Sequence, residues 1–317
     1  MKTSVALCTY NGEKYITSQL NSILSQTIAV DEIIVCDDGS SDSTMDIVQL
    51  YKEKHPSVFK VYRNEKNLRS VKNFEKAISL CTHEIIFLSD QDDVWENNKV
   101  EAHLNYFGQH PNIQVIATNG YCIDNHDEKK EMYSFWDVPA IAKSTDTDYT
   151  IRDTLSKVAN IATGASMSLR KSFLPEIIPF PNAPHLHHDE WMAFIASQKD
   201  AFAMLNEKLF SYRIHDSQQI GGVFFTKNKQ SLLFLKRTFG LIQDFKGLSK
   251  YIKRLSNTYK RNRLYLQLQP RHHEMIENNM KDIEKVYAEK VTLMKQLYPV
   301  RSRVLLFTDI FKNKRRL

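Results

Sequence analysis

The chain is organised around Leu88-Ser89-Asp90-Gln91-Asp92-Asp93-Val94-Trp95, an acidic stretch that follows the apolar run of residues 84–88. The apolar run predicts a buried strand of a parallel sheet. Three carboxylates then fall within four residues at the end of that strand. Carboxylates this close together repel one another unless a cation or a raised pKa relieves the repulsion. The stretch has two interpretations: a solvated turn that caps a helix starting near Glu96, or a ligand site at a strand end.

Short apolar runs alternate with amphipathic segments around this stretch. The first strands are expected at residues 3–9, 31–36, 59–63 and 84–88, with helices at 13–26, 43–54 and 70–80. Further strands are expected at 113–118, 164–170 and 209–215, with a long surface loop at 124–150. Because the first connections are short, the pattern favours a mostly parallel sheet covered by helices on both faces. The predicted fold class is α/β.

The composition is that of a globular protein, with 42% apolar and 25% charged residues among 317. The start of the sequence lacks the long apolar region of a signal peptide, and the longest apolar runs are strand-sized. The four cysteines, Cys8, Cys36, Cys81 and Cys122, lack metal-ligand spacing and are expected to be small buried side chains. These features predict a reduced, cytoplasmic protein.

The net charge of +6 hides an asymmetry. Residues 224–317 hold 22 Lys and Arg against 7 Asp and Glu, whereas residues 1–223 hold 21 against 30. We therefore expect an acidic catalytic domain over 1–223 and a basic helical extension over 224–317, broken near Pro270 and Pro299. The end of the chain combines apolar side chains with a cationic cluster, which suits an anionic membrane surface; a solvated helix is the alternative. No nucleic-acid module is recognisable, so nucleic acid is not an expected partner.

Polar side chains gather at four expected strand ends. They are Thr9-Tyr10-Asn11, Asp37-Asp38-Gly39-Ser40, Asp90-Gln91-Asp92-Asp93 and His188-Asp189-Glu190. Adjacent strands would place the first two in one crevice, where a carboxylate can accept hydrogen bonds from a base or ribose. Turn chemistry alone also explains the Asp-Asp pair. No glycine-rich phosphate loop is present, so a divalent cation held by Asp92, with Asp90 nearby, would neutralise a diphosphate.

Three motifs carry a resemblance to a known family. The motifs at residues 5–11, 37–42 and 89–95 resemble those of glycosyltransferase family 2 in order and distance, over roughly residues 3–220. The resemblance implies a GT-A fold, a nucleotide-diphosphate sugar donor, Mn²⁺ or Mg²⁺ as cofactor, and inversion at the anomeric carbon. The His-Asp pair at 188–189, followed by Tyr212-Arg213-Ile214-His215, is most similar to the rhamnosyltransferase-like branch that builds bacterial surface polysaccharides.

The resemblance also implies roles for particular residues. The nucleotide would contact Thr9, Tyr10, Asn11, Asp37 and, as its neighbour, Asp38. Asn67 falls where the family often contacts the donor, and Arg69 could assist it. Asp90 and Asp92 match the family's D-x-D motif, with Asp92 as the metal ligand, whereas Asp93 would only cap the next helix.

Asp189 matches the family's catalytic base, which would deprotonate the acceptor hydroxyl as it attacks opposite the leaving nucleotide diphosphate. A helix start explains an Asp here equally well, and Glu190 is the alternative base. Arg213 and His215 would reach the diphosphate; a structural pair on an edge strand is the alternative. The histidines at 185, 187 and 188 have no matching spacing for a zinc site and are expected to be solvated or to contact substrate.

The expected function is an inverting, metal-dependent transfer of a single sugar, with rhamnose as a candidate, in cell-surface polysaccharide (O-antigen or capsule) synthesis. The acceptor would be a glycan or a lipid-linked oligosaccharide, and the enzyme would act in the cytoplasm, peripherally at the inner face of the membrane. One alternative is a non-catalytic nucleotide-sugar-binding scaffold at the membrane. Another is a nucleotide-sugar hydrolase or a nucleotidyltransferase.

Overall fold

Two compact units divide the chain. The computed structural model describes residues 1–145, 147–215 and 224–312. The first unit comprises Met1–Met132 and Ala162–Phe224, and the second comprises Tyr133–Ile161 and the chain from Phe225 onward. Every site residue expected from the sequence falls in the first unit.

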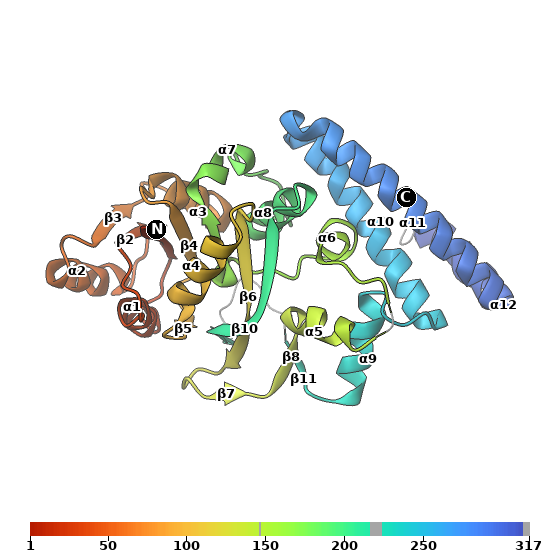
Figure 1. Ribbon diagram of the computed structural model, residues 1–317, viewed down its shortest axis with the longest axis horizontal. Coiled ribbons are helices and arrows are strands. Elements are labelled where there is room, and N and C mark those ends of the chain that lie inside the picture. Colours follow the sequence, from red (N-terminus) through yellow and green to blue (C-terminus); the bar gives the residue numbers. More distant parts are fainter. Residues whose placement is uncertain (146, 216–223, 313–317) are drawn as a thin grey trace. The chain divides into compact units, whose positions relative to one another are not determined.

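A nine-stranded sheet forms the centre of the first unit (Figure 1). Its strand order is β3-β2-β1-β4-β9-β6-β10-β5, and β7 pairs with β6. The strands are β1 (Thr3–Thr9), β2 (Glu32–Asp37), β3 (Phe59–Arg63), β4 (Ile85–Ser89), β5 (Val94–Trp95), β6 (Val115–Ile123), β7 (Lys129–Lys130), β9 (Ser168–Arg170) and β10 (Phe202–Arg213). β1 to β4 run parallel to one another, as do β6 and β10, whereas β5, β7 and β9 pair antiparallel. The predicted α/β class with a mostly parallel sheet is confirmed.

Helices flank this sheet (Figure 1). They are α1 (Ile16–Leu24), α2 (Thr44–Lys54), α3 (Arg69–Leu80), α4 (Lys99–Gln109), α7 (Leu174–Ile177) and α8 (His188–Gln198), with 3-10 turns η3 (Gly164–Ser166) and η4 (Lys171–Phe173). β1, β2 and β4 are buried along their whole length, as continuous apolar runs predict for strands covered on both faces. On α1, Ile16, Leu20 and Ile23 share one face and are fully buried.

The strand register aligns the carboxyl ends of β1, β2 and β4. Thr9, the last residue of β1, lies opposite Asp37, the last residue of β2. Leu7 lies opposite Ser89, the last residue of β4. Because these parallel strands end at the same edge of the sheet, the polar segments that follow them emerge close together. The expected adjacency of the first two strands is confirmed.

The segment after residues 90–93, the second acidic turn, does not form the helix start that is predicted near Glu96. Val94–Trp95 forms β5, which pairs antiparallel with β10, and α4 begins later with Asn98 as its N-cap. A helix that starts near Glu96 and is capped by Asp93 is therefore wrong. Tertiary packing explains the difference, since the buried Trp95 ring packs against Phe87 of β4 with ring centroids 5.6 Å apart.

Residues 124–150 are not the long surface loop that their polar composition predicts. They contain β7, the 3-10 turn η1 (Phe135–Asp137) and helix α5 (Val138–Lys143), and α6 (Ile151–Asp153) and the π-helical turn η2 (Thr154–Val158) follow. Trp136 and Val138 are fully buried. A few apolar anchors fold this polar segment onto a core, and average composition hides them.

The second unit is helical, as expected for the C-terminal part of the chain. Its further elements are α9 (Lys229–Thr238), α10 (Phe245–Leu268), η5 (Pro270–His272), α11 (His273–Leu297), α12 (Pro299–Lys312) and the short strand pair β8 (Met132–Ser134) and β11 (Phe224–Thr226). α10 and α11 lie side by side (Figure 1) and pack around Leu248, Ile252 and Met294. The helix breaks expected near Pro270 and Pro299 are confirmed.

The inserted segment 133–161 belongs with these helices. Asn279 of α11 donates hydrogen bonds to the Ser156 carbonyl oxygen (3.0 Å) and to the Asn262 amide oxygen (3.1 Å). The Thr258 hydroxyl of α10 donates to the Val158 carbonyl oxygen at 3.3 Å. These bonds satisfy buried backbone groups of η2. A single boundary at residue 223 therefore omits an earlier segment that folds with the C-terminal helices.

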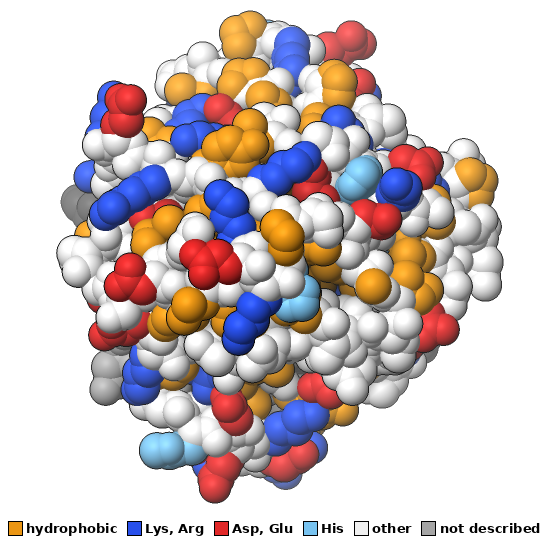
Figure 2. Space-filling model, turned by 90° about the vertical axis from the view of Figure 1, so that its left-hand side faces the viewer, with side chains coloured by type: hydrophobic (Ala, Val, Ile, Leu, Met, Phe, Trp, Pro, Cys, Tyr) orange, Lys and Arg blue, Asp and Glu red, His pale blue; other side chains and the backbone are white. Residues whose placement is uncertain are grey.

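Charged side chains of both signs are interspersed on the face seen in Figure 2, where no large area carries one sign. No helix in the described part of the chain is both long enough and apolar enough to cross a bilayer. All four cysteines are buried and unpaired by disulfides, which confirms their expected place in the core.

Candidate active site

Residues 37–40, the first acidic turn, are held in place by hydrogen bonds from neighbouring residues of the protein. The fully buried carboxylate of Asp37 accepts hydrogen bonds from the Thr9 hydroxyl (3.0 Å), the N–H groups of Gly39 (3.1 Å) and Ser40 (2.9 Å), and the Ser40 hydroxyl. Arg63 adds an ion pair at 3.7 Å. Gly39 permits this tight turn because its φ of 90° is accessible to glycine. The structure brings Thr9 and Asp37 together, and it satisfies the Asp37 carboxylate from within the protein.

Asp38 is also engaged by protein donors. Its carboxylate accepts hydrogen bonds from the Asn64 amide (2.8 Å) and from the N–H groups of Leu68 (2.7 Å) and Arg69 (2.9 Å). The Asn67 amide donates to the Asp38 carbonyl oxygen at 3.1 Å. Asp38 therefore anchors the loop of residues 64–69, and Asn67 lies exposed on that loop.

Gln91 joins the end of β1 to the second acidic turn. Its side-chain amide accepts a hydrogen bond from the Tyr10 N–H (2.8 Å) and donates one to the Tyr10 carbonyl oxygen (2.9 Å). A Cβ at Gly12 would lie 2.2 Å from Gln91 Oε1, so glycine makes room for this amide. The Tyr10 side chain is 43% exposed, while the Asn11 amide oxygen accepts a hydrogen bond from the Ser41 N–H (2.8 Å). No sequence pattern predicts that Gln91, between Asp90 and Asp92, forms this bridge.

The second acidic turn lacks comparable donors. Among the described residues, no hydrogen bond reaches the Asp90 carboxylate, and Asp93 Oδ2 is buried without a partner. Burial, with the charges of Asp92 and Asp189, raises the pKa of Asp90 to about 7. Burial, with the charges of Asp92 and Asp90, also raises the pKa of Asp93 well above its usual range. A carboxylate cluster in which burial and mutual repulsion raise the pKa values is stabilised when a cation binds.

Arg213 and His215, at and after the end of β10, contact the second acidic turn. Arg213 is 1% exposed; it donates from Nε to the Asp92 carbonyl oxygen (2.8 Å) and from its backbone N–H to Asp93 Oδ1 (3.1 Å). Its guanidinium also pairs with Asp127. His215 Nε2 lies 2.9 Å from Asp92 Oδ2. In this arrangement Arg213 holds the turn in place, whereas His215 contacts the carboxylate itself.

Gly164 brings Asp189 close to the same turn. Asp189 lies in the first turn of α8, and its carboxylate accepts a hydrogen bond from the Gly164 N–H at 3.1 Å. A Cβ at Gly164 would lie 2.8 Å from His188 Nε2 and 3.9 Å from Asp90 Oδ2, so glycine allows these side chains to approach. Burial raises the pKa of Asp189 and lowers the pKa of His188 to about 4. The His188 ring stacks on Phe74 with centroids 4.2 Å apart, and both ring nitrogens are buried without a hydrogen-bond partner.

Two alternatives to Asp189 as a base are that it only caps helix α8, or that Glu190 is the base instead. His187, not Asp189, is the N-cap residue of α8, although the Asp189 carboxylate also accepts a hydrogen bond from the Glu190 N–H (2.6 Å). Glu190 is buried, whereas Asp189 is half-buried. Asp189 is therefore the candidate base that lies beside the carboxylate cluster.

Lys99 is a buried cation beneath the second acidic turn. Its Nζ donates a hydrogen bond to the Ala165 carbonyl oxygen (2.6 Å) and lies 4.2 Å from the centre of the Trp95 ring. Burial lowers the pKa of Lys99 to about 7, although Asp93 and Asp90 oppose this shift. Through Ala165, Lys99 supports the turn that contains Gly164. This residue is not recognisable from the sequence, because a lysine at a helix start is normally solvated.

The residues of the second turn fit a divalent cation. Asp90 and Asp92 offer carboxylate oxygens, and burial and the charge of Asp92 raise the pKa of Asp90 although Lys99 opposes this shift. Within residues 1–145, 147–215 and 224–312, no group of three or more His, Cys, Asp or Glu side chains is arranged to hold a metal by itself. Mg²⁺ is commonly held by one or two carboxylates together with substrate phosphates and water. The donor set therefore fits a cation that is completed by a bound diphosphate.

The chain is similar to a known protein family and to several known proteins. A family model described as glycosyl transferase family 2 matches residues 4–178, which is more than half of the chain. The dTDP-rhamnosyl transferase RfbG of Shigella flexneri is 33% identical over 99 residues, covering 30% of this chain and 34% of that protein. The matches to this and other curated relatives span 17–65% of the relatives' own lengths.

Two solved structures resemble the whole described fold. TarS 1–349 of S. aureus, in complex with UDP-GlcNAc, has a TM-score of 0.57 at 18% identity, covering 91% of this chain and 92% of that chain. The mannosyltransferase PcManGT of Pyrobaculum calidifontis, in complex with GDP-Man and Mn²⁺, has a TM-score of 0.53 at 13% identity, covering 98% and 79%. The predicted GT-A fold is confirmed. Together with the family match over residues 4–178, these findings show that the chain belongs to glycosyl transferase family 2.

Proposed function

We propose that this protein transfers a single sugar from a nucleotide-diphosphate sugar to a glycan acceptor, with inversion at the anomeric carbon, in the synthesis of a cell-surface polysaccharide. Family membership supports the transfer from a nucleotide sugar. The proposal of an inverting, metal-assisted transfer rests on the positions of Asp189 and Asp90, which both lie close to Gly164. An inverting displacement needs a base for the acceptor and charge stabilisation for the leaving group; Asp189 would supply the base, and a cation held at Asp90 and Asp92 would supply the charge stabilisation.

Asp189 is the proposed general base. Its carboxylate takes the proton of the acceptor hydroxyl while the hydroxyl oxygen forms a bond to the anomeric carbon. The bond between that carbon and the diphosphate oxygen breaks, and its electron pair leaves with the nucleotide diphosphate. Burial raises the pKa of Asp189, which makes its carboxylate a stronger base than a solvated aspartate. The Gly164 N–H orients one carboxylate oxygen.

The nucleotide is proposed to lie along the ends of β1 and β2. The exposed Tyr10 ring offers a stacking surface for a base, and Thr9 and Asn11 flank it. Asp37 and Asp38 shape this edge by holding its loops, and Asn67 lies on the adjoining loop. For the donor, dTDP-rhamnose and UDP-GlcNAc are the first compounds to test, because RfbG is a dTDP-rhamnosyl transferase and TarS was solved with UDP-GlcNAc.

Asp92, with Asp90, is proposed to hold Mn²⁺ or Mg²⁺. The cation would stabilise the negative charge that develops on the leaving diphosphate. His215 contacts the Asp92 carboxylate and would lie next to that diphosphate, whereas the buried Arg213 positions the turn. Neither residue requires a rearrangement of the turn for these roles.

Paired variants test the proposal. Asp189→Asn should keep donor binding in calorimetry and lose turnover by about 10²–10⁴-fold, because it removes the general base. Asp92→Ala should instead lose the Mn²⁺-dependent part of donor binding, and Asp282→Ala, an exposed carboxylate on α11, is the control. Full turnover by Asp189→Asn would overturn the base assignment, whereas intact cellular function of a variant that has lost turnover would favour a scaffold role. Sugar release without an acceptor would identify a hydrolase, and a product that keeps the donor's anomeric configuration by NMR would exclude inversion.

We also propose that the basic region of residues 224–317 docks on an anionic membrane surface at the cytoplasmic face and so reaches a lipid-linked acceptor. Its excess of 22 Lys and Arg over 7 Asp and Glu supports this partner. Deleting residues 300–317 should reduce co-sedimentation with vesicles that contain phosphatidylglycerol, and added salt should weaken binding of the full chain. Equal sedimentation of the two chains would contradict a role for this segment.

A further inference from the structure

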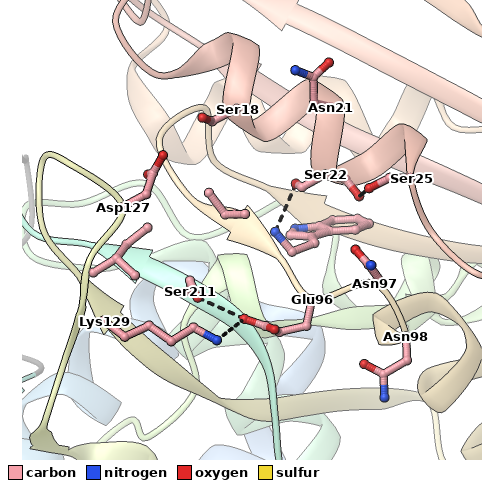
Figure 3. Close-up of a pocket in the computed structure, with 13 residues that line it drawn as sticks. Ser18, Asn21, Ser22, Ser25, Glu96, Asn97, Asn98, Asp127, Lys129 and Ser211 are labelled. Atoms are coloured by element: carbon pink, nitrogen blue, oxygen red, sulfur yellow. Dashed lines mark hydrogen bonds and ion pairs between the residues drawn. The ribbon is translucent and has the colours of Figure 1, made fainter.

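A polar pocket lies in the first unit, between α1, the segment after β5 and the turn between β6 and β7 (Figure 3). Its volume is about 740 Å³, within the range of small-molecule sites of roughly 300–1,000 Å³. Its lining includes none of the residues assigned above to the nucleotide, the cation or the base. The residues that line it are Ser18, Asn21, Ser22, Ser25, Val94, Trp95, Glu96, Asn97, Asn98, Ile123, Asp127, Lys129 and Ser211.

One wall of the pocket is a polar stripe on α1. Ser18, Asn21, Ser22 and Ser25 are spaced i, i+3, i+4 and i+7, so they share one side of the helix, and Figure 3 shows them along it. The opposite side of α1 carries the apolar residues that pack in the core. Within the stripe, the Ser22 hydroxyl accepts a hydrogen bond from the Trp95 N–H, the Ser25 hydroxyl donates to the Ser22 carbonyl oxygen, and the Asn21 amide oxygen accepts from Tyr51.

The charged residues of the pocket are already matched. Glu96 pairs with Lys129 at 3.0 Å and accepts a hydrogen bond from the Ser211 hydroxyl at 3.0 Å (Figure 3). Asp127 pairs with Arg213. Because each carboxylate has a cationic partner, the pocket offers no unmatched charge that would select an ionic ligand.

Several neutral polar side chains of the pocket are unused. Among the described residues, no hydrogen bond engages the side chains of Ser18, Asn97 or Asn98. Each asparagine offers two donors and an acceptor, and serine offers one donor and two lone pairs. Val94, Trp95 and Ile123 add apolar surface to the lining. Unused neutral donors and acceptors on two sides of the pocket, next to apolar surface, match the hydroxyl groups and C–H faces of a carbohydrate.

We propose that this pocket binds a neutral oligosaccharide segment of the acceptor or product glycan, at a subsite separate from the catalytic base. This inference rests on the proposed function, because a glycan must be the acceptor. One contact chain links the pocket to the catalytic turn: Asp127 pairs with Arg213, and Arg213 Nε donates to the Asp92 carbonyl oxygen. A glycan held here would be retained near the enzyme while its growing end reaches Asp189.

The test measures glycan binding to the full chain without donor. The probes are neutral oligosaccharides of three to six sugars built from glucose, galactose, N-acetylglucosamine or rhamnose, screened by saturation-transfer NMR and then titrated. The double variant Asn97→Ala/Asn98→Ala should weaken binding of the best probe about tenfold, because it removes two amide partners. Ser25→Trp should weaken it further by filling the pocket. The asparagine changes remove no hydrogen bond that caps a helix, whereas Ser25→Trp removes the bond from the Ser25 hydroxyl to the Ser22 carbonyl oxygen (3.3 Å).

Asn105→Ala is the matched control, since Asn105 is exposed on α4 outside the pocket. This control and Asp189→Asn should bind the probe as the unmodified chain does. Absence of binding by every probe, or equal binding by the pocket variants, would overturn the subsite. Donor binding is measured separately, so loss of the subsite would leave the transferase proposal standing. Failure of the transferase proposal would show instead as absent donor binding or turnover.

Discussion

Two acidic turns of the first unit look alike in sequence and differ in structure. Asp37-Asp38 and Asp92-Asp93 each follow a buried parallel strand of the same sheet. The first pair accepts hydrogen bonds from hydroxyl, amide and backbone donors on three surrounding segments. In the second turn, Asp90 has no donor among the described residues and one oxygen of Asp93 is buried without a partner.

The difference shows what separates a structural carboxylate from an available one. Gly39 turns the chain back at once, so the N–H groups of Gly39 and Ser40 point at Asp37. The second turn instead continues into β5, which pairs with β10, and the Trp95 N–H donates to the Ser22 hydroxyl (3.0 Å). Carboxylates without donors keep their mutual repulsion, and they are therefore the ones that a cation stabilises. The number of hydrogen-bond donors around an aspartate, more than the number of aspartates in a turn, therefore indicates which carboxylates a cation would stabilise.

The largest expected effect is the loss of stability when a carboxylate of the first turn is replaced. Asp37→Asn should lower the free energy of unfolding by about 2–3 kcal/mol, because the amide nitrogen cannot accept the hydrogen bonds that the buried carboxylate receives. Chemical denaturation at pH 7 measures this change. Asp46→Asn, on the first turn of α2, is the control for a carboxylate whose loss should have little effect. Equal stability of Asp37→Asn and the unmodified chain would break the distinction between the turns.

A smaller effect concerns the buried imidazole beside the second turn. Burial lowers the pKa of His188 to about 4 from 6.5, so between these values the unfolded chain binds a proton that the folded chain does not. The stability contributed by the neutral ring is complete above pH 6.5 and is lost as the pH falls towards 4. His188→Phe keeps the stacking and removes the proton, so its stability loss between pH 7 and pH 4.5 should be smaller by about 2 kcal/mol. Identical acid profiles in urea denaturation would contradict this account.

The smallest expected effect has the opposite sign. In the metal-free protein, Asp90→Asn should raise the free energy of unfolding by about 1 kcal/mol at pH 8, because it removes a buried charge from the cluster. The pKa of Asp90 is raised from 3.8 to about 7, so between these values the folded chain keeps a proton that the unfolded chain has lost, and the folded chain loses stability as the pH rises towards 7. The gain should therefore shrink at pH 5, where Asp90 is protonated. A loss of stability at pH 8 would place Asp90 with the structural carboxylates of the first turn.

Much of this fold could be predicted because its signals are local. The apolar runs of β1, β2 and β4 and the helical spacing of Ile16, Leu20 and Ile23 need only short stretches of sequence to be recognised. The pairing of Thr9 with Asp37 followed from the adjacency of two parallel strands. The two incorrect predictions concern segments whose structure depends on non-local packing. Trp95 packs in the core as part of β5, where a helix start is expected. Trp136 is buried and holds in place a segment whose composition predicts a polar loop.

The sequence by itself determined the α/β class, the order of the strands along the chain and the motifs that resemble family 2, because each depends on residue type and short spacing. Only the tertiary structure decided which aspartate carboxylates accept hydrogen bonds from the protein and which have few or no donors. It also placed Gly164 between Asp189 and Asp90 and buried Lys99 beneath them. These properties depend on groups that lie far apart in the chain, and folding alone brings those groups within hydrogen-bonding and electrostatic range.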